Sequence, residues 1–596
     1  MFKKSLIVIY SVAIICITNI CTAQIYNDHY GIGNDATIKV SGSTEESGTT
    51  AFSTVNGTGY FPDLAGASRF LSQATLGYNQ QQIEDVANTG IKNWLEEQFN
   101  IAPASYYAKY DSIYNDVANL TNSNKERKEY ISFTFYDMVL KQPDVLRQKV
   151  AFALSQILVL NRSRFGYAAF SYYDVLYTNA FGNYHDLLNQ VTYHPAMGLY
   201  LSTFKNKKAD FALNTFPDEN YARELMQLFS IGLWQLNNNG SQKFDADGNP
   251  IRTYDIADIE QLAKVFTGLG AGATTTGQPA NFLVSQGILE RNTPLAMYDA
   301  YHDKSTKRLI DGTTLAYNQP GTDDIKTTLD VLFNHPNVGP FISTRLIQHL
   351  VKSNPSPQYI NRVANVFNNN GNGVRGDLKA VIKAIFLDVE VRDCSHIDET
   401  TSGKLIQPIE RLLHLYVAFN ISTPSNKFYL SDIKEFKDAT EQSFLNAPTV
   451  FNFFTPFFAE SDFVEPAGIV SPEFEILNTY TTISYINLIE NILKQKPFTN
   501  YTKASGVVGV LAENINDEPV LDFTTELALL SNNGIGALIE HLDILLSRGQ
   551  LTFDNKTIIE NTLSQNFANV TGYTNKDAVK DAIYYIMISP NYTILK

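Results

Sequence analysis

Cysteine and positive charge are both scarce in this sequence. Three cysteines occur in 596 residues, and two of them, Cys16 and Cys21, lie in the first 21 positions. Loss of that segment would leave Cys394 alone, so we expect no internal disulfide and a fold stabilised by packing. Lysine and arginine number 46 against 61 aspartates and glutamates, which gives a net charge of −15. No basic cluster is long enough for a phosphate backbone, so the composition disfavours nucleic acid and anionic membrane surfaces as partners.

Long apolar runs are missing outside the N-terminus. Two lysines precede an apolar run at 6–17, and small residues follow up to Ala23. This pattern predicts a secretory signal peptide over 1–23, and therefore a secreted or periplasmic protein. Beyond it no segment reaches the roughly 18 apolar residues that a bilayer crossing needs, so we expect no membrane span after cleavage.

Standard catalytic and nucleotide-binding signatures are also missing, including G-x-S-x-G, H-E-x-x-H, C-x-x-C and the P-loop. The glycines at 266–277 follow a helical pattern rather than a strand, which excludes a dinucleotide-binding loop there. In "DADGN", residues 245–249, the glycine stands fourth rather than sixth and no glutamate closes the loop. We interpret this run as a hairpin turn, with calcium as the weaker alternative. The sequence indicates no metal site, and it leaves the cofactor unknown.

What the sequence does contain is apolar residues, 44% of the chain, arranged at helical spacing. Segments with this pattern end at Gly, Asn or Pro, and they include 67–77, 81–99, 143–161, 340–353, 357–368, 377–388, 408–419 and 577–589. No repeat of fixed period connects them, which disfavours a solenoid. The pattern predicts a mainly α fold, a large irregular multi-helix domain with a small β-hairpin insertion.

Composition also divides the chain. Residues 24–58 are rich in Gly, Ser, Thr and Asn and have little apolar periodicity, which predicts a flexible segment. The helical domain is expected over 59–596. Turn signals and short β-tending pieces interrupt it near 243–255 and 281–318, where we expect the hairpin excursions.

One helix concentrates charge. The segment "FPDENYARELMQLFSIG", residues 216–232, has Pro217 suited to a first turn and Gly232 able to end the helix. At about 100° per residue, one face carries Glu219, Asn220, Arg223, Glu224 and Gln227. This face is either a solvated surface with an i,i+4 pair between Glu219 and Arg223, or a site. Two carboxylates with a cation between them suit acid/base chemistry or cation binding.

A second candidate lies in "AYHDKSTKRLIDG", residues 300–312. His302, Asp303 and Lys307 stand there in a loop context. A histidine beside an aspartate is a plausible general base or metal ligand, although side chains of adjacent residues usually diverge. The alternative is a surface turn of mixed charge.

Several segments in a fixed order resemble a known family. They are "HPAMGLYL", "DENYARELMQLFSIGL", "YDIADIEQLAKVFTG", "YHDKSTKRLIDG", "HPNVGPFISTRLIQHLV" and "NAPTVFNFFTPFF". Together they resemble the large bacterial family catalogued as domain of unknown function 1800, from about Ala67 to the end of the chain. The most specific piece is Glu-Asn-x-Ala-Arg-Glu at 219–224, and the His-Asp-x-x-x-Lys piece is matched by His302, Asp303 and Lys307.

The chain departs from the family pattern at one place. Where the family commonly continues with Glu-Leu-His-Thr-Leu-Gly, this sequence has Gln227-Leu228-Phe229-Ser230-Ile231-Gly232. The resemblance implies a predominantly helical, exported bacterial protein, and it carries no settled activity.

Two functions remain open. The first is a hydrolase or lyase that acts on an extracellular or envelope polymer such as a polysaccharide. Glu219 and Glu224 would supply acid/base or cation-binding groups, and Arg223 would orient a carboxylate or stabilise developing negative charge. His302 and Asp303 would act from a facing loop. Substrate would be bound by two further residues, Asn220 and Lys307.

The second function is a non-catalytic binding or scaffold protein of the cell envelope. In that case the charged helix face forms a salt-bridge network that fixes helix register, and Asp303 and Lys307 join it structurally. An accessible cleft lined by both segments would favour the enzyme. Complete pairing closed to solvent would favour the scaffold.

Overall fold

The computed structural model describes residues 62–121, 128–162, 165, 167–392, 401–432, 435–460, 468–494, 501–503, 511–513 and 516–596. The signal peptide expected at 1–23, the segment 24–58 and Cys394 lie outside these residues. The described part is mainly helical, with short antiparallel strand pairs, and this confirms the predicted fold class.

The first group of helices contains most of the central core. It comprises α2 (Leu64–Ala74), α3 (Gln80–Thr89), α4 (Ile91–Asn100), α5 (Tyr106–Thr121), α6 (Lys128–Lys141), α7 (Val145–Ile157), α8 (Ala168–Thr178), the 3₁₀ turn η3 (Asn179–Phe181), α9 (Tyr184–Tyr193) and α10 (Pro195–Tyr200). Helix α7 is buried along its whole length from Leu146 to Ile157. A helix that is buried all round must be covered on every side, so α7 is the axis around which the others pack.

The middle of the chain adds a second group. It comprises α11 (Asn220–Gln227), α12 (Ile256–Val265), η4 (Gln286–Ile288), α13 (Gly321–Asn334), α14 (Val338–Leu350), α15 (Pro357–Asn368), α16 (Leu378–Leu387) and α17 (Val389–Arg392). Helix α15 shows how local sequence sets such an element. Ser356 caps its first turn by accepting a hydrogen bond from the N–H of Tyr359 at 3.0 Å, and Pro357 occupies the first helical position.

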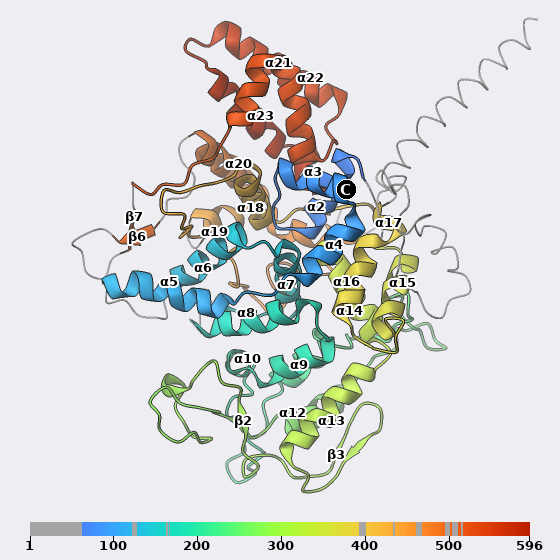
Figure 1. The fold of residues 1–596 in the computed structure, drawn as a ribbon. Helices are drawn as coiled ribbons and strands as arrows, with labels where there is room; N and C mark the ends of the chain where they lie inside the picture. The colour runs from blue at the N-terminus through green and yellow to red at the C-terminus, as the bar shows by residue number, and fades with distance from the viewer. Residues whose placement is uncertain are drawn as a thin grey trace, which may run out of the picture.

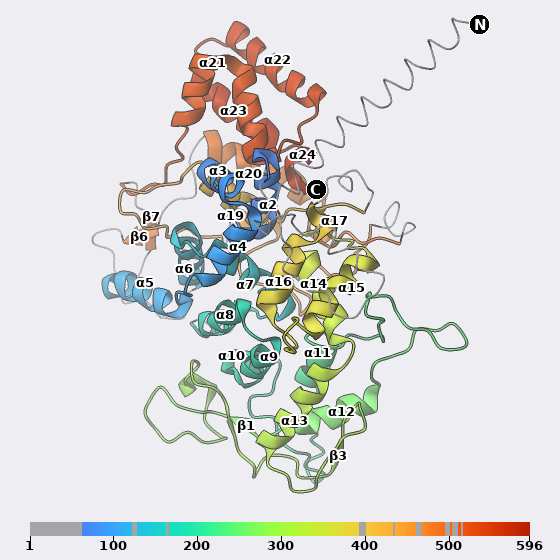
Figure 2. The ribbon, with the colours of Figure 1, turned by 45° about the vertical axis from the view of Figure 1, so that its right-hand side comes forward.

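The last group completes the molecule. It comprises α18 (Pro408–Ala418), α19 (Glu435–Thr440), η7 (Pro472–Ile476), α20 (Thr479–Lys494), α21 (Thr524–Leu542), the π turn η8 (Asp543–Ser547), α22 (Phe553–Asn569), α23 (Asn575–Met587) and α24 (Pro590–Thr593). Figures 1 and 2 show α21, α22 and α23 at one end of the molecule and α12 and α13 at the other, with α7 between them.

The strands are short and pair antiparallel. They are β1 (Leu269–Gly270) with β2 (Ala296–Met297), β3 (Lys307–Arg308) with β4 (Thr314–Leu315), β5 (Lys404–Leu405) with β8 (Ile594–Leu595), and β6 (Tyr501–Lys503) with β7 (Leu511–Glu513). Isolated bridges from Trp234–Arg252 to Phe244–Pro250 form a further ladder around the Asp245 turn. There the carboxylate of Asp245 accepts hydrogen bonds from the backbone N–H groups of Asp247 and Asn249, both at 2.9 Å. The carboxylate thus stabilises the turn in which it lies.

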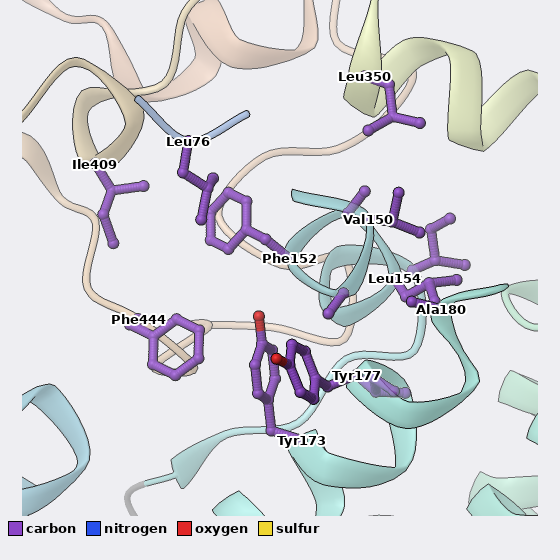
Figure 3. Close-up of a cluster of buried hydrophobic side chains, with 14 of the residues drawn as sticks. Leu76, Val150, Phe152, Leu154, Tyr173, Tyr177, Ala180, Leu350, Ile409 and Phe444 are labelled. Carbon is purple, nitrogen blue, oxygen red and sulfur yellow. The ribbon is translucent and has the colours of Figure 1, made fainter. Parts of the chain in front are cut away.

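Aromatic side chains fill the core around α7. Figure 3 shows Phe152 and Leu154 of this helix among Tyr173, Tyr177 and Phe444. The ring of Phe444 stacks on that of Phe135 with centroids 3.8 Å apart. Stacked and edge-to-face rings of this kind add to the free energy gained from burial alone. The loop that carries Phe444 is therefore fixed against α6, α7 and α8.

The two ends of the described chain meet. Strand β8 pairs with β5, and the guanidinium Nε of Arg69 in α2 donates to the carbonyl oxygen of Lys596 at 2.6 Å. Arg548 adds hydrogen bonds to the carbonyl oxygens of Asn591, Tyr592 and Ile594. The C-terminal residues are thus part of the core packing and not an appended tail.

Candidate functional site

Helix α11 carries the charged face predicted from the sequence. It begins at Asn220, whose backbone N–H donates to the carboxylate of Asp218 at 2.9 Å. Pro217 lies ahead of the helix and not in its first turn, because the Asp218 bond starts the helix later than expected. Gly232 ends the segment, as predicted, with a left-handed φ of +70°. A side chain there would meet the ring of Phe341 at 2.8 Å, so glycine is required for space as well as conformation.

The two faces of α11 divide as the periodicity indicates. Tyr221 and Leu225 are buried, and the opposite face carries the charges. Arg223 and Glu219 form an ion pair at 3.1 Å, with side chains 43% and 39% exposed. An exposed pair of this kind stabilises by at most about 1 kcal/mol. Asn220 beside it is exposed.

Glu224 differs from its neighbours because it is half buried. Burial raises the pKa of this carboxyl above its ordinary value, and the nearby charge of Arg223 opposes the shift. Its Oε2 atom has no hydrogen-bond partner within the described residues, and neither has the buried hydroxyl of Tyr254. Burial raises the pKa of Tyr254 to about 12. The charge of Glu224 adds to this increase, and the charge of Arg223 opposes it. Glu224 and Tyr254 thus each have a buried oxygen without a hydrogen-bond partner in the described residues.

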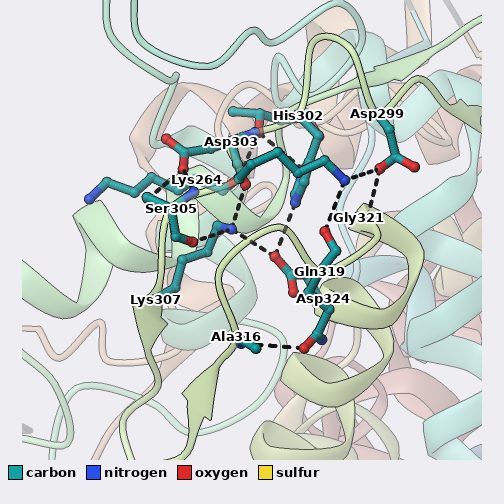
Figure 4. Close-up of polar contacts among 12 residues, drawn as sticks. Lys264, Asp299, His302, Asp303, Ser305, Lys307, Ala316, Gln319, Gly321 and Asp324 are labelled. Carbon is teal, nitrogen blue, oxygen red and sulfur yellow. Dashed lines mark hydrogen bonds and ion pairs between the residues drawn. The ribbon is translucent and has the colours of Figure 1, made fainter.

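His302 lies in a sealed network (Figure 4). Its side chain is 0% exposed, and its Nε2 atom lies 3.0 Å from the carboxylate of Asp324 in α13. Its Nδ1 atom lies 2.9 Å from the carbonyl oxygen of Thr267. Both ring nitrogens thus lie within hydrogen-bond distance of a neighbouring oxygen.

Lys307 completes this network from β3. Its ammonium group donates to the carbonyl oxygens of Asp303 and Ser305, at 2.5 and 3.1 Å, and to Asp324 Oδ2 at 2.7 Å. Three acceptors use the three hydrogens of the ammonium group, and the side chain is 1% exposed. This arrangement disfavours the predicted substrate-binding role of Lys307, because no donor is left for a ligand.

Asp303 points away from the imidazole, as expected for adjacent residues. Its carboxylate accepts hydrogen bonds from the backbone N–H and hydroxyl of Ser305, and its own N–H donates to the hydroxyl of Thr267 at 2.8 Å. Burial raises the pKa of Asp303, but the Ser305 hydrogen bonds and the charge of Lys307 outweigh it and leave the pKa below its ordinary value. The carboxylate acts as a turn cap and not as the partner of His302.

The two predicted groups make no direct polar contact with each other within the described residues. Asn206 connects them indirectly, since its side chain bonds to the backbone of Asp218 and its carbonyl oxygen accepts from Gly268 N–H at 2.8 Å. No hydrogen bond or ion pair within the described residues joins Glu219, Arg223 or Glu224 to His302 or Asp303. The catalytic roles assigned to these five residues stay a prediction, and the sealed position of His302 argues against its share of it.

A cavity of about 420 Å³ opens at the C-terminal end of α11. The sequence did not indicate it. Its walls come from the end of α7, Gln227 and Leu228, the stretch 232–242, helix α14, and the segments 450–457 and 470–473. Three of the segments that carry the family resemblance thus converge here. Gln227, at a position where the family commonly has glutamate, leaves that part of the wall uncharged, whereas Phe229 packs in the core.

Helix α14 contributes two titratable side chains to the cavity wall, Arg345 and His349. The Nη1 atom of Arg345 donates to Gln348 Oε1 at 2.6 Å, and its guanidinium lies 4.5 Å from the ring centre of Phe457. Burial lowers the pKa of Arg345 to about 10 and that of His349 well below its ordinary value. Sequence reasoning could have found them, because Arg345, Gln348 and His349 form a polar stripe at i, i+3 and i+4 in an apolar helix.

The remaining charges beside the cavity are paired. Glu473 forms an ion pair with Lys404 at 3.0 Å, and Lys149 forms one with Glu410. No cluster of three or more histidine, cysteine, aspartate or glutamate side chains in the described residues could hold a metal ion. None of the helices described has the length and apolar run that crossing a bilayer requires.

Comparison with known proteins places the chain in a family. The family model described as "Protein of unknown function (DUF1800)" matches residues 69–594, nearly the whole chain. No curated protein and no solved structure matches it. The geometry of the chain is thus the basis for any functional argument.

Proposed function

Because the chain belongs to the DUF1800 family of proteins of unknown function, we propose its role from its own geometry. We propose an exported, non-catalytic binding protein of the cell envelope that holds its ligand in the cavity beside α11 and α14. The observation that carries this proposal is the sealed His302 network, which removes the best general base of the enzyme hypothesis from contact with any substrate.

The network has the properties of a structural element. His302, Asp324 and Lys307 are at most 1% exposed. The carboxylate of Asp324 contacts the side chains of both His302 and Lys307. Removing one partner of a buried ion pair costs about 3–5 kcal/mol, because the other charge stays buried. The network joins the loop at 299–307 to α13, so it fixes this end of the molecule.

The cavity has the properties of a binding site. Its volume falls in the range of about 300–1,000 Å³ that is typical of small-molecule sites, and aromatic residues supply much of its wall. Trp234, Phe341, Phe454 and Phe457 provide flat apolar surface, on which both sugar rings and hydrocarbon groups pack. Two buried polar atoms on the same wall, Gln156 Nε2 and His349 Nδ1, make no hydrogen bond within the described residues.

Ligand binding is tested with a variant that fills the cavity. Thr344 lines it, and its hydroxyl bonds to the carbonyl oxygen four residues earlier, that of Pro340. We expect Thr344→Trp to abolish calorimetric binding of envelope fragments, polysaccharide fragments included, that the wild type binds. Thr482→Trp is the matched control, because Thr482 makes the same bond to Asn478 on an exposed helix face. Equal binding by both variants would contradict the assignment of this cavity.

Export is tested separately from binding. The full chain is produced with its N-terminus in a Gram-negative host, and its intact mass is measured in periplasm and medium. Loss of residues 1–23 is expected. A full-length mass confined to the cytoplasm would refute export without bearing on the cavity.

Glu224 favours a second candidate, a hydrolase or lyase acting on an envelope polymer. A half-buried carboxyl with a raised pKa and an unsatisfied oxygen is suited to general acid catalysis, and Tyr254 and Arg223 lie within electrostatic reach. If this candidate holds, Glu224→Gln abolishes activity in a screen against polysaccharides while the fold is retained.

Two further variants separate the candidates. Glu219→Gln changes a carboxylate on the same face that is more exposed and already paired, and it should leave any activity unchanged. His302→Ala should lower the free energy of unfolding instead. Absence of any activity in the wild type, together with destabilisation by His302→Ala, supports the binding protein. Activity lost in folded Glu224→Gln alone supports the enzyme.

A further inference from the structure

The starting point is that Arg345 is a buried cation without a counterion. Arg345 is 9% exposed, and no carboxylate of the described residues lies within ion-pair distance of its guanidinium group. One hydrogen bond, to Gln348, uses one of its five N–H groups. A charge held this way loses hydration without gaining a counterion, which is costly unless an anion completes the site.

The neighbouring charges do not compensate for it. Lys404 is neutralised by Glu473, and Lys149 by Glu410. These pairs lie close enough that Lys404, Arg345 and Lys149 all lower the pKa of His349, after burial itself. The wall around Arg345 thus carries one positive charge in excess.

Other unsatisfied polar atoms share this cavity. Neither ring nitrogen of His349 makes a hydrogen bond within the described residues, and Nδ1 is fully buried. The amide Nε2 of Gln156, from the end of α7, also has no acceptor, although its Oε1 accepts from Gln407 and Asn452. Buried polar atoms are seldom left unpaired in native proteins, so this end of the cavity has hydrogen-bonding capacity that the described residues do not use.

The aromatic rings define how a ligand approaches. Phe457 and Phe341 pack against the Arg345 guanidinium, with its central carbon 4.5 and 5.3 Å from their ring centres. Packing of the rings against the guanidinium leaves the N–H groups, which point outward in the guanidinium plane, free to donate hydrogen bonds. A planar carboxylate matches that fork with two parallel hydrogen bonds.

We propose that the Arg345 end of the cavity binds the carboxylate of an amphiphilic monoanion whose apolar body packs on the aromatic wall. This rests on the proposed ligand-binding function and specifies the ligand class. A single excess positive charge favours a carboxylate over a phosphate monoester, because a dianion would leave one negative charge buried and unpaired.

Three probes with the same eight-carbon chain test the charge. Octanoate, octanol and octyl phosphate are titrated calorimetrically into the full-length mature protein at pH 7 and fixed ionic strength. The wild type is expected to bind octanoate at least tenfold more tightly than octanol, and more tightly than octyl phosphate. Equal affinity for octanoate and octanol would overturn the carboxylate assignment, and tighter binding of octyl phosphate would overturn the charge argument.

Variants test the residues. Arg345→Gln should lose the tenfold preference for octanoate while octanol affinity stays the same, and Gln227→Glu should weaken octanoate by adding a negative charge to the wall. Arg308→Gln removes the same charge from an exposed position of β3 and should change nothing. Unchanged octanoate binding in folded Arg345→Gln refutes the proposal. If Arg345→Gln fails to fold, Gln227→Glu decides in the same way.

The outcomes separate this inference from the function on which it rests. Octanol binding that Thr344→Trp abolishes, without a preference for octanoate, retains the cavity as a binding site and refutes the anion subsite. Binding of no probe refutes the anion subsite, and the cavity itself is then decided by the Thr344→Trp comparison with envelope fragments.

Discussion

Asp324→Asn would remove the carboxylate that His302 and Lys307 share. The His302 and Lys307 nitrogens lie 3.0 and 2.7 Å from Asp324 Oδ2, and none of the three side chains is more than 1% exposed. Breaking a buried pair costs roughly 3–5 kcal/mol. Because the asparagine amide oxygen can still accept one hydrogen bond, we expect a loss near the lower end, about 3 kcal/mol of the free energy of unfolding.

The assay is urea unfolding followed by circular dichroism, with equal slopes required for the comparison. In the double variant Asp324→Asn with Lys307→Met, one uncompensated cation is removed together with the carboxylate. The decrease in the free energy of unfolding of the double variant should be smaller, by about 1–2 kcal/mol, than the sum of the decreases in the two single variants.

A matched control exists on the same helix. Lys326 and Asp330 of α13 form an ion pair at 2.7 Å, the same length as the Lys307 pair, but the Lys326 side chain is 74% exposed. Lys326→Gln should leave stability unchanged within error. A loss below about 1 kcal/mol for Asp324→Asn, or strict additivity in the double variant, would refute the structural role of the network.

Three further predictions concern other parts of the molecule. Burial raises the pKa of Glu224, so the stability that its neutral form contributes is complete below about pH 4.5 and is lost as pH rises through the folded pKa. The melting temperature of Glu224→Gln, relative to that of the wild type, should therefore increase from pH 4 to 7. A difference in melting temperature that does not change with pH would contradict this. Burial lowers the pKa of His414 to about 3, so its contribution is complete above about pH 6.5 and is lost as pH falls toward 3; His414→Phe, which retains the stacking on Tyr78, should reduce acid unfolding, and an unchanged acid midpoint would exclude this residue. Gly232→Ala should lower the free energy of unfolding by about 1–3 kcal/mol in a urea titration, because φ is +70° and the new Cβ meets Phe341, and a neutral effect would show that the segment relaxes freely.

Helices with local signals could be predicted closely from the sequence. The segment 357–368 matches α15 at both ends, because a serine cap stands directly before it, a proline occupies its first position and an apolar stripe runs along it. The charged face of α11 also follows from periodicity alone. Its start was misplaced, since the bond from Asn220 to Asp218 competes with a start at Pro217.

The environment of His302 could not be predicted in this way. Its partner Asp324 is 22 residues away, at the start of another helix, and Thr267 is 35 residues away in the other direction. Nothing in the local pattern distinguishes a loop histidine on the surface from one sealed by such contacts. The cavity poses a similar difficulty, because segments far apart in the sequence form it. The polar stripe of α14 can be seen in the sequence, but it does not show which other segments face it.

The pairing of β8 with β5, and the bond from Arg69 to Lys596, affect the order in which the molecule can be completed. Synthesis proceeds from the N-terminus, so α2 emerges more than 500 residues before the carbonyl oxygen that Arg69 contacts. Contacts this distant in sequence form slowly. The packing of α2 against β8 therefore cannot be completed until the residues of β8 and Lys596 have been synthesised.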